Sequence, residues 1–477
     1  DFKKWLLKAW FLGKNEFKRT YLHKVLGATQ TLEKSEFCKN LWLQVFDSSD
    51  SNAYWEERET LLKLFYKYNP SFPTAYVDQV LPEKIAALDK DKQIKALTGL
   101  IDTEKGLLIS LLIGGQLAKS LLVDKYEELE WYLANLDLDD MNEQKIWIND
   151  YFRKYKFSKL SDKIDPELST LLATKNSGSE AFYNWYYSFK TVAQLLVEEK
   201  HDRVVWIDAL GFEWAPYIVN ILERQMGFVV EKKFVARANI PSITDNNRIP
   251  GATYIQDFDQ IIHSDYKHPQ SLIKQLSLVK TLIMNKIYVS DGQTVAIVSD
   301  HGTTALARLQ ENVKTYNFAD SSHEGRCMWV KDKFMEDKDV IIHETDLSGE
   351  KKTCLIALRY TSLYNRPKHE VHGGGTPEEV LVPVLFVSKT KATVPQTFSV
   401  SPTVVKLSVR KPVLSLSIKP MPPLGTKPSI QFKNKKIGEL QLDKAEERWK
   451  LTLVGFKSGS YELTLKVGAS EHLIKIE

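Results

Sequence analysis

The sequence predicts an α/β protein whose mostly parallel sheet is preceded by a helical domain and followed by a small β domain. Residues 1–175 carry apolar side chains at helical spacing, residues 176–390 alternate buried strands with helices, and residues 391–477 alternate apolar and polar side chains between Pro, Gly and Asn. The chain has 477 residues, 43% hydrophobic and 26% charged. That length suits roughly two to four domains with sizeable cores.

The helical domain, residues 1–175, is predicted from segments such as KYEELEWYLANL and EQKIWINDYFRKYKF. In both segments the apolar residues recur at i, i+3, i+4 and i+7, which places them on one face of a helix. We expect the tryptophans here to pack between helices rather than to stack on nucleic-acid bases. They are Trp5, Trp10, Trp42, Trp55, Trp131 and Trp147.

The α/β domain, residues 176–390, is predicted from the apolar runs in DRVVWIDALG, GFVVEKKFVARA, QTVAIVSDHG and EEVLVPVLFVS. Amphipathic segments such as APYIVNILERQM and SLIKQLSLVKTLIMNK separate these runs. Strands joined by helices of this length form βαβ units, so we expect mostly parallel pairing. Functional side chains of such sheets gather where the strands end.

The β domain, residues 391–477, is expected to form a small sandwich of immunoglobulin-like size, because its short alternating segments carry no helical signal. It contains 15 Lys and Arg against 7 Asp and Glu, a surplus of 8 within a chain of net charge +4. One interpretation is a surface that meets phosphate backbones. The other is a solvated β surface whose lysines keep strand edges from pairing.

Composition also excludes several classes. No apolar run approaches the roughly 20 residues of a membrane span, and the start DFKKWLLKAWFLGK is too charged for a signal peptide. The three cysteines, Cys38, Cys327 and Cys354, lie far apart, which argues against a disulfide framework and a thiolate zinc site. We therefore expect a cytoplasmic protein with no membrane partner. Because the chain starts at Asp1, we also expect a fragment or a processed form.

Acids and histidines occur at strand ends and at metal-ligand spacing within the α/β domain. Asp208 ends one buried run, and Asp300 and His301 end another. Taken alone, such residues also cap helices or form turns. Asp259 and His263 stand four apart, so on a helix they share one face and can hold one ion or form an ordinary surface pair.

Three further positions complete the set. His372 precedes three glycines, either in an exposed loop or where the backbone approaches another group closely. Ser242 and Thr244 lie in PSITDNNR, where the Ser242 to Asp245 pattern is an ordinary capping box. A hydroxyl at a helix start is equally suited to attack a phosphate. The local sequence leaves both interpretations open.

The order Asp, Thr, Asp-x-x-x-His, Asp-His-Gly and a late His-Gly-Gly resembles the ligand order of the alkaline phosphatase superfamily. The strings WIDALGFEW, PSITDNNR, SDHG and HGGGTPEEVLVPVLF are similar to its PglZ family, the phosphatase-like component of bacterial phage-exclusion (BREX) systems and of some two-component regulators. The resemblance covers roughly residues 200–390, and it implies an alkaline-phosphatase-like core.

The resemblance implies two divalent metal ions, zinc or alternatively manganese or magnesium. Asp208, Asp300, His301 and the Thr244 oxygen would hold the first ion. Asp259, His263 and His372 would hold the second. Thr244 would be the nucleophile, and a water would hydrolyse the phosphothreonine intermediate.

Several assignments stay open at this point. Asp257 competes with Asp259 as the ligand, and Ser242 competes with Thr244 as the nucleophile. Arg248, Arg326 and His323 are either phosphate contacts or structural residues.

The resemblance implies a phosphomonoesterase or phosphodiesterase that acts in defence against phage. Its partners would be a phosphoester substrate and other defence-system proteins. Alternatives are a metal-dependent nuclease on DNA or RNA, guided by the basic C-terminal domain or the helical region, and a non-catalytic scaffold whose metal site is structural or regulatory. Neither the substrate nor the oligomeric state follows from the motifs, because related monoester and diester enzymes share their ligands and differ in pocket shape.

Overall fold

The structure is a computed structural model. It describes residues 2–31, 33–47, 51–140, 142, 145–310, 313–314, 321–322, 325–330, 334–347, 349–389, 398–407, 412–419, 422, 427–433, 435–443, 448–456, 459–467 and 470–476. The chain divides into two compact units. One comprises Asp1–Val219, Lys232–Tyr288 and Val295–Phe386, and the other comprises Asn220–Glu231, Val289–Thr294 and Val387–Glu477.

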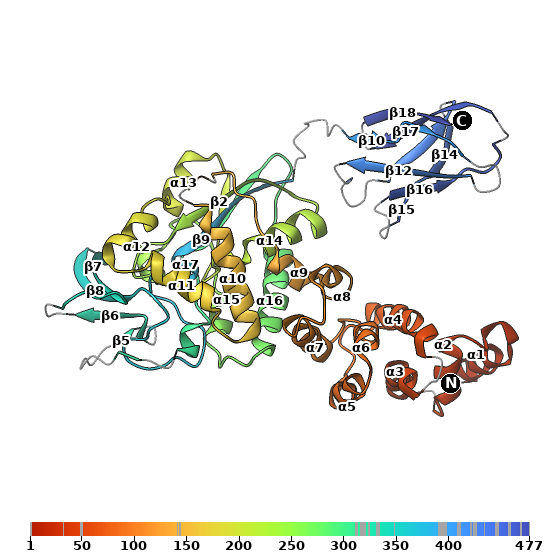
Figure 1. Cartoon of the computed structure of the whole chain (residues 1–477), viewed down its shortest axis with the longest axis horizontal. Coiled ribbons are helices and arrows are strands. Elements are labelled where there is room, and N and C mark those ends of the chain that lie inside the picture. Colours follow the sequence, from red (N-terminus) through yellow and green to blue (C-terminus); the bar gives the residue numbers. More distant parts are fainter. Residues whose placement is uncertain are drawn as a thin grey trace. The chain divides into compact units, whose positions relative to one another are not determined.

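Helices make up the first part of the chain (Figure 1, red to yellow). Their bounds are α1 Phe2–Gly13, α2 Tyr21–Ala28, α3 Lys34–Leu43, α4 Ser51–Tyr68, α5 Ala75–Ala86, α6 Lys90–Ala96, α7 Asp102–Ile113, α8 Leu122–Lys125, α9 Glu127–Leu133, α10 Trp147–Ser161, α11 Pro166–Lys175, α12 Ser179–Tyr186 and α13 Val192–Glu198. In the part of the chain that the structure describes, no helix combines the length and the apolar character that crossing a membrane requires.

The tryptophans of the helical region follow the packing prediction only in part. Trp42, Trp55 and Trp131 are buried, whereas Trp5 and Trp10 are 55% and 54% exposed. The prediction is wrong for these two because α1 contributes no buried residue. Helix α1 packs against α2 and the 3-10 turn Asn15–Phe17, and these contacts leave both tryptophans exposed.

The central sheet has five strands in the order β2-β9-β4-β1-β3. Strand β1 pairs in parallel with both β3 and β4, which confirms an α/β fold with parallel strands. The elements are β1 Arg203–Ile207, the 3-10 turn η4 Phe212–Trp214, α14 Ala215–Asn220, the π-helical turn Ile221–Gln225, β2 Val229–Arg237, the 3-10 turn η6 Thr244–Asn246, β3 Thr253–Ile255, α15 Asp257–Ile262, α16 Gln270–Lys286, β4 Thr294–Val298, α17 Pro377–Val380 and β9 Leu381–Ser388.

Apolar side chains hold this sheet together. All eight residues of β9 are buried, and four of five are buried in β4. Trp206, Phe234, Val298 and Phe386 belong to one core cluster with Val192 of α13. Burial on both faces explains why these strands read as continuous apolar runs. Polar side chains at their carboxyl ends therefore stand at the rim of a rigid core.

A second sheet lies between β4 and β9 in the sequence, where the sequence patterns predicted no strands. Its order is β5-β6-β8-β7 and its pairings are antiparallel. The strands are β5 Ser321–Ser322, β6 Cys327–Val330, β7 Val340–Leu347 and β8 Glu350–Ala357. The described part of this segment also contains Cys327 and Cys354, which are buried free thiols, as is Cys38.

The last part of the chain forms two sheets, in the orders β10-β12-β16-β15 and β11-β18-β17-β13-β14. Leu414, Leu416 and Ile418 of the first sheet share a core with Leu463, Leu465 and Ile474 of the second. The strands are β10 Ser399–Ser401, β11 Val404–Val405, β12 Val413–Lys419, β13 Ser429–Phe432, β14 Lys435–Glu439, β15 Gln441–Asp443, β16 Arg448–Thr452, β17 Tyr461–Val467 and β18 Ser470–Ile476.

Candidate metal centre

The parallel pairing of β1 and β4 brings three predicted ligands together. Asp208 follows the last residue of β1, and Asp300 and His301 follow β4, so all three stand at the same edge of the sheet. One ligand atom from each lies within 4.8 Å of the others. Nε2 of His301 is 3.5 Å from Oδ1 of Asp208 and 3.5 Å from Oδ2 of Asp300. We call these three residues the buried cluster.

The buried cluster is acidic and shielded from water. Asp208, Asp300 and His301 are at most 2% exposed. Burial, reinforced by the neighbouring Asp300 carboxylate, raises the pKa of Asp208 to about 7. Oδ2 of Asp300 is buried and accepts no hydrogen bond. A divalent cation would supply both the missing positive charge and the missing partner, so the donor set fits a metal.

A second group, the open cluster, consists of Asp259, His263 and His372. Asp259 lies in the first turn of α15 and His263 caps its end, so the i, i+4 spacing places both on one side of the helix. Oδ1 of Asp259 lies 3.3 Å from Nε2 of His263 and 4.0 Å from Nε2 of His372. That buried oxygen accepts no hydrogen bond, which again suits a cation.

The two clusters are neighbours and differ in access to solvent. The imidazole rings of His301 and His372 stack on one another. In the open cluster the side chains of Asp259 and His263 are 25% and 39% exposed, whereas the buried cluster is closed. The open cluster is therefore the side of the site that solvent reaches.

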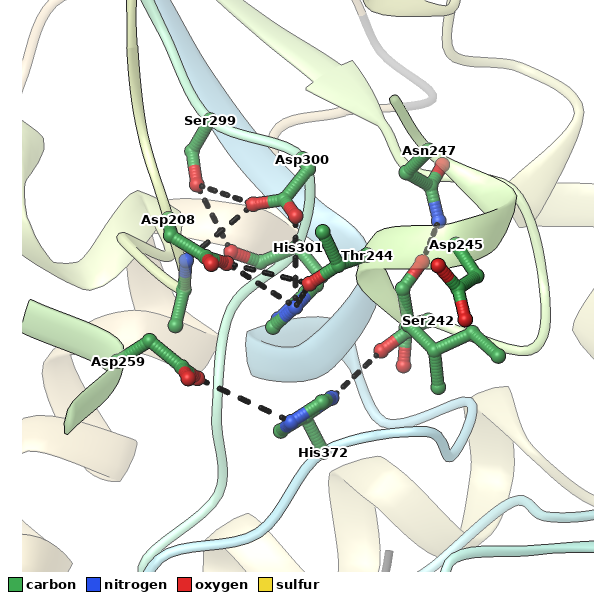
Figure 2. Close-up of polar contacts among 12 residues, drawn as sticks. Asp208, Ser242, Thr244, Asp245, Asn247, Asp259, Ser299, Asp300, His301 and His372 are labelled. Carbon is green, nitrogen blue, oxygen red and sulfur yellow. Dashed lines mark hydrogen bonds and ion pairs between the residues drawn. The ribbon is translucent and has the colours of Figure 1, made fainter. Parts of the chain in front are cut away.

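Thr244 stands at the buried cluster, as predicted (Figure 2). Its Oγ1 donates to Oδ1 of Asp208 at 3.3 Å and lies 3.1 Å from Nε2 of His301. The residue begins the 3-10 turn η6 and is half-buried, so its hydroxyl is not sealed off. The structure thus brings the candidate nucleophile and three candidate ligands together.

Ser242 occupies a different place from Thr244. It is fully buried, and its Oγ donates to the carbonyl oxygen of Gly374 at 2.8 Å. Of the two interpretations of Ser242, the capping box with Asp245 is wrong, because Ile243 is the N-cap of η6 and no side chain caps that turn. The Ser242 hydroxyl instead forms hydrogen bonds with the backbone of Gly373 and Gly374.

The remaining open assignments separate by position. Asp257 is exposed and lies outside both clusters, whereas Asp259 belongs to the open one. Arg326 is buried in an ion pair with Glu379, so it is structural. Arg248 is exposed and pairs with Asp245. His323, the third predicted phosphate contact, lies outside the described residues.

Tyr254 is a site residue that the sequence patterns did not predict. It lies on the short edge strand β3, and its hydroxyl donates to Oδ2 of Asp208. Its ring packs against Trp206 with centroids 4.4 Å apart, and 45% of the residue is exposed. Burial and the Asp208 carboxylate raise the pKa of this hydroxyl, so it remains a donor at neutral pH.

Lys159 of α10 pairs with two buried carboxylates that lie close in sequence to the candidate ligands. Its Nζ lies 3.1 Å from Oε1 of Glu213 and 3.0 Å from Oε1 of Glu370, and all three side chains are at most 2% exposed. Glu213 follows the Asp208 segment, and Glu370 precedes His372 by two positions. Thr303, two residues after His301, donates to Glu370 at 2.9 Å. The buried ammonium thus connects the Asp208 and His372 segments, and Glu370 extends the connection to the His301 segment.

The two carboxylates keep Lys159 charged. Burial alone would lower the pKa of Lys159, but the carboxylates of Glu213 and Glu370 outweigh burial and raise it. The lysine therefore stays charged. A buried ion pair of this kind is costly to break, because removing one partner leaves the other uncompensated.

Two glycines allow the ligand segments to approach each other. A Cβ at Gly302 would lie 2.1 Å from the carbonyl oxygen of Glu378, and a Cβ at Gly374 would lie 2.5 Å from the Glu379 carboxylate. The obstacle at Gly302 is backbone, so only glycine fits there. At Gly374 the obstacle is the buried ion pair of Arg326 and Glu379, whose side chains would have to shift to admit a larger residue. The Asp-His-Gly and His-Gly-Gly patterns thus have a steric cause in addition to any chemical one.

No protein-family model and no curated protein matches the sequence of this chain. The chemistry of the site therefore rests on its own geometry.

Proposed function

We propose that this chain is a metal-dependent phosphohydrolase with a two-metal site and a threonine nucleophile. The observation that carries the proposal is the position of the Thr244 hydroxyl, which bonds to Asp208 and His301 beside two carboxylate and histidine clusters. Carboxylates and imidazoles without thiolate suit zinc, and also manganese or magnesium. Two such ions would activate the hydroxyl and neutralise the leaving oxygen.

Each step of the proposed reaction is assigned to residues of this site. Thr244 Oγ1 gives up its proton to solvent water and attacks phosphorus, forming an Oγ1–P bond as the P–O bond to the leaving group breaks. Solvent water also supplies the proton that the leaving oxygen takes up. Asp208, at 3.3 Å, is placed to orient the hydroxyl, and Tyr254 holds the other oxygen of that carboxylate. The leaving group takes a proton and departs through the open cluster. A water then attacks the phosphothreonine, which releases phosphate and restores Thr244.

We further propose that the central sheet is an alkaline-phosphatase-like core of the PglZ type and that residues 391–477 form a β-sandwich. The motif strings near Asp208, Thr244, Asp300 and His372 support the first assignment, and the shared core of the two C-terminal sheets supports the second. By the same resemblance, the protein would act in the bacterial cytoplasm with other proteins of a phage-defence system.

The experiment that tests this function is a metal-reconstituted assay. Protein stripped with a chelator and reloaded with Zn²⁺ or Mn²⁺ is given a chromogenic phosphomonoester, the matching bis-ester, or a nucleic acid. We expect metal-dependent turnover of the monoester or the bis-ester, and its loss in Asp300→Asn. Turnover of nucleic acid alone would favour the nuclease alternative. No turnover of any substrate by the metal-loaded chain would favour a scaffold.

A further inference from the structure

A buried serine links the ligand-bearing segments within the buried cluster. Ser299, which immediately precedes Asp300, is 0% exposed. Its Oγ accepts from the backbone N–H of Leu210 at 2.9 Å and donates to the carbonyl oxygen of His301 at 2.9 Å. Since Leu210 lies two residues after Asp208, this single hydroxyl fixes the Asp208 segment to the Asp300–His301 segment.

A second buried serine makes the equivalent link at the open cluster. Ser242 is 0% exposed, and its Oγ accepts from the N–H of Gly373 at 3.0 Å and donates to the carbonyl oxygen of Gly374 at 2.8 Å. Its own carbonyl oxygen lies 3.0 Å from Nδ1 of His372. This contact leaves Nε2 of His372 directed at Asp259. Ser242 thus fixes the His372 loop to the turn that carries Thr244.

We propose that each metal site has its own positioning serine, Ser299 for the buried cluster and Ser242 for the open cluster. The inference rests on the two-metal function proposed above, and it assigns Ser242 a role other than nucleophile. Groups that orient metal ligands set the affinity of the metal, and losing one costs about 10- to 100-fold in affinity. Each serine also satisfies backbone groups that would otherwise be buried without partners.

The two serines provide matched controls for each other. A merely structural role would lower thermal stability and leave the two metal affinities unchanged or lower them equally. A positioning role requires a crossed pattern, in which each variant weakens one site and spares the other. The measurement is therefore a calorimetric titration of the chelator-stripped full chain with Zn²⁺, with thermal unfolding recorded alongside.

The two binding events are first assigned with variants that remove one site each, Asp300→Asn for the buried cluster and His263→Ala for the open cluster. Ser299→Ala should then weaken the event that Asp300→Asn abolishes by about 10-fold or more. Ser242→Ala should weaken the event that His263→Ala abolishes by a similar factor. In each serine variant the Zn²⁺ affinity of the other binding event should stay within about 3-fold of the wild-type value, because losing a group that orients a metal ligand usually costs about 10-fold or more.

The inference is overturned if either serine variant leaves both affinities unchanged, or if both variants weaken both events equally. Should an alanine variant unfold before titration, Ser299→Cys and Ser242→Cys replace it, because they keep the side-chain volume with a weaker donor. They should give smaller losses in the same crossed pattern. If the wild-type chain binds no Zn²⁺, the two-metal function is overturned as well. If the wild type binds Zn²⁺ and the serine variants bind it equally well, only this inference is overturned.

Discussion

The imidazoles of His301 and His372 lie face to face, with ring centroids 4.0 Å apart and planes inclined by 13°. One belongs to the buried cluster and the other to the open cluster. Neighbouring ligands of this kind predict neighbouring ions, and two-metal hydrolases space their ions about 3.5–4 Å apart. Anomalous diffraction at the zinc edge should show two peaks with this spacing. A single peak shared by both histidines would contradict the two-site account.

Asp208 should lower the stability of the metal-free protein, because burial and the neighbouring Asp300 carboxylate disfavour its charge more than His301 favours it. Replacing it in Asp208→Asn should raise the unfolding free energy of chelator-treated protein by about 1–3 kcal/mol, since one buried charge is removed. The same change should remove the part of the Zn²⁺ stabilisation that comes from the buried cluster and leave the part that comes from the open cluster. Chemical unfolding with and without metal measures both effects. A metal-free variant less stable than the wild type would refute the electrostatic argument.

Lys159 should be among the residues most sensitive to substitution. Lys159→Met leaves Glu213 and Glu370 buried without their cation, so we expect a loss of about 3–5 kcal/mol. Adding Glu213→Gln should restore part of the loss, because only one carboxylate then remains. Urea unfolding at pH 8 provides the measurement. The exposed Lys163 supplies the control, since Lys163→Met should change stability by about 0.5 kcal/mol or less.

Glu378 predicts a pH dependence of stability. Burial, with a contribution from the Glu379 charge, raises its pKa from 4.5 to about 7. The folded state therefore holds this proton more tightly than the unfolded state. The protonated carboxyl therefore makes its full contribution to the free energy of unfolding below about pH 4.5. This contribution is lost as the pH rises through 7.

Glu378→Gln removes this titration and keeps an acceptor for the Tyr151 hydroxyl, which bonds to Oε2 at 2.5 Å. The variant should gain stability relative to the wild type between pH 5 and pH 8, by up to about 3 kcal/mol. Unfolding free energies of both proteins at the two pH values test it. An equal difference at both values would show that the carboxyl is ionised throughout.

The central part of the fold could be predicted because buried parallel strands read as unbroken apolar runs. Asp208 and Asp300 stand out where such runs stop, and parallel pairing then brings them together. The sheet of β5 to β8 was missed because β7 and β8 are only half-buried, with polar residues over half their length. Strand β3 is three residues long, so nothing marked Tyr254 as a neighbour of Asp208.

Contacts between distant segments could not be predicted from one sequence. Lys159 sits in a lysine-rich helix, KYKFSKLS, where each lysine is expected to face solvent. Its partners Glu213 and Glu370 are 54 and 211 residues away. Ser242 resembled a helix cap for the same reason, because its glycine partners lie more than 130 residues further along. These are tertiary pairings without a local signal.

The central claim is that Thr244 attacks phosphorus and that the remaining ligands are enough to hold the first metal ion without its oxygen. Thr244→Ala removes the attacking oxygen and leaves Asp208, Asp300 and His301 in place, so metal content should survive while turnover falls by at least about 10²-fold. Asp300→Ala should reduce metal content and turnover together, because it removes a charged ligand.

The most direct measurement determines bound zinc and phosphoester turnover on the same preparations of wild type, Thr244→Ala and Asp300→Ala. The account predicts that Thr244→Ala keeps the zinc content of the wild type and loses most of its turnover. It predicts that Asp300→Ala loses zinc and turnover together. A Thr244→Ala protein that keeps both its zinc and its turnover would contradict the account, since the attacking oxygen would then come from another group.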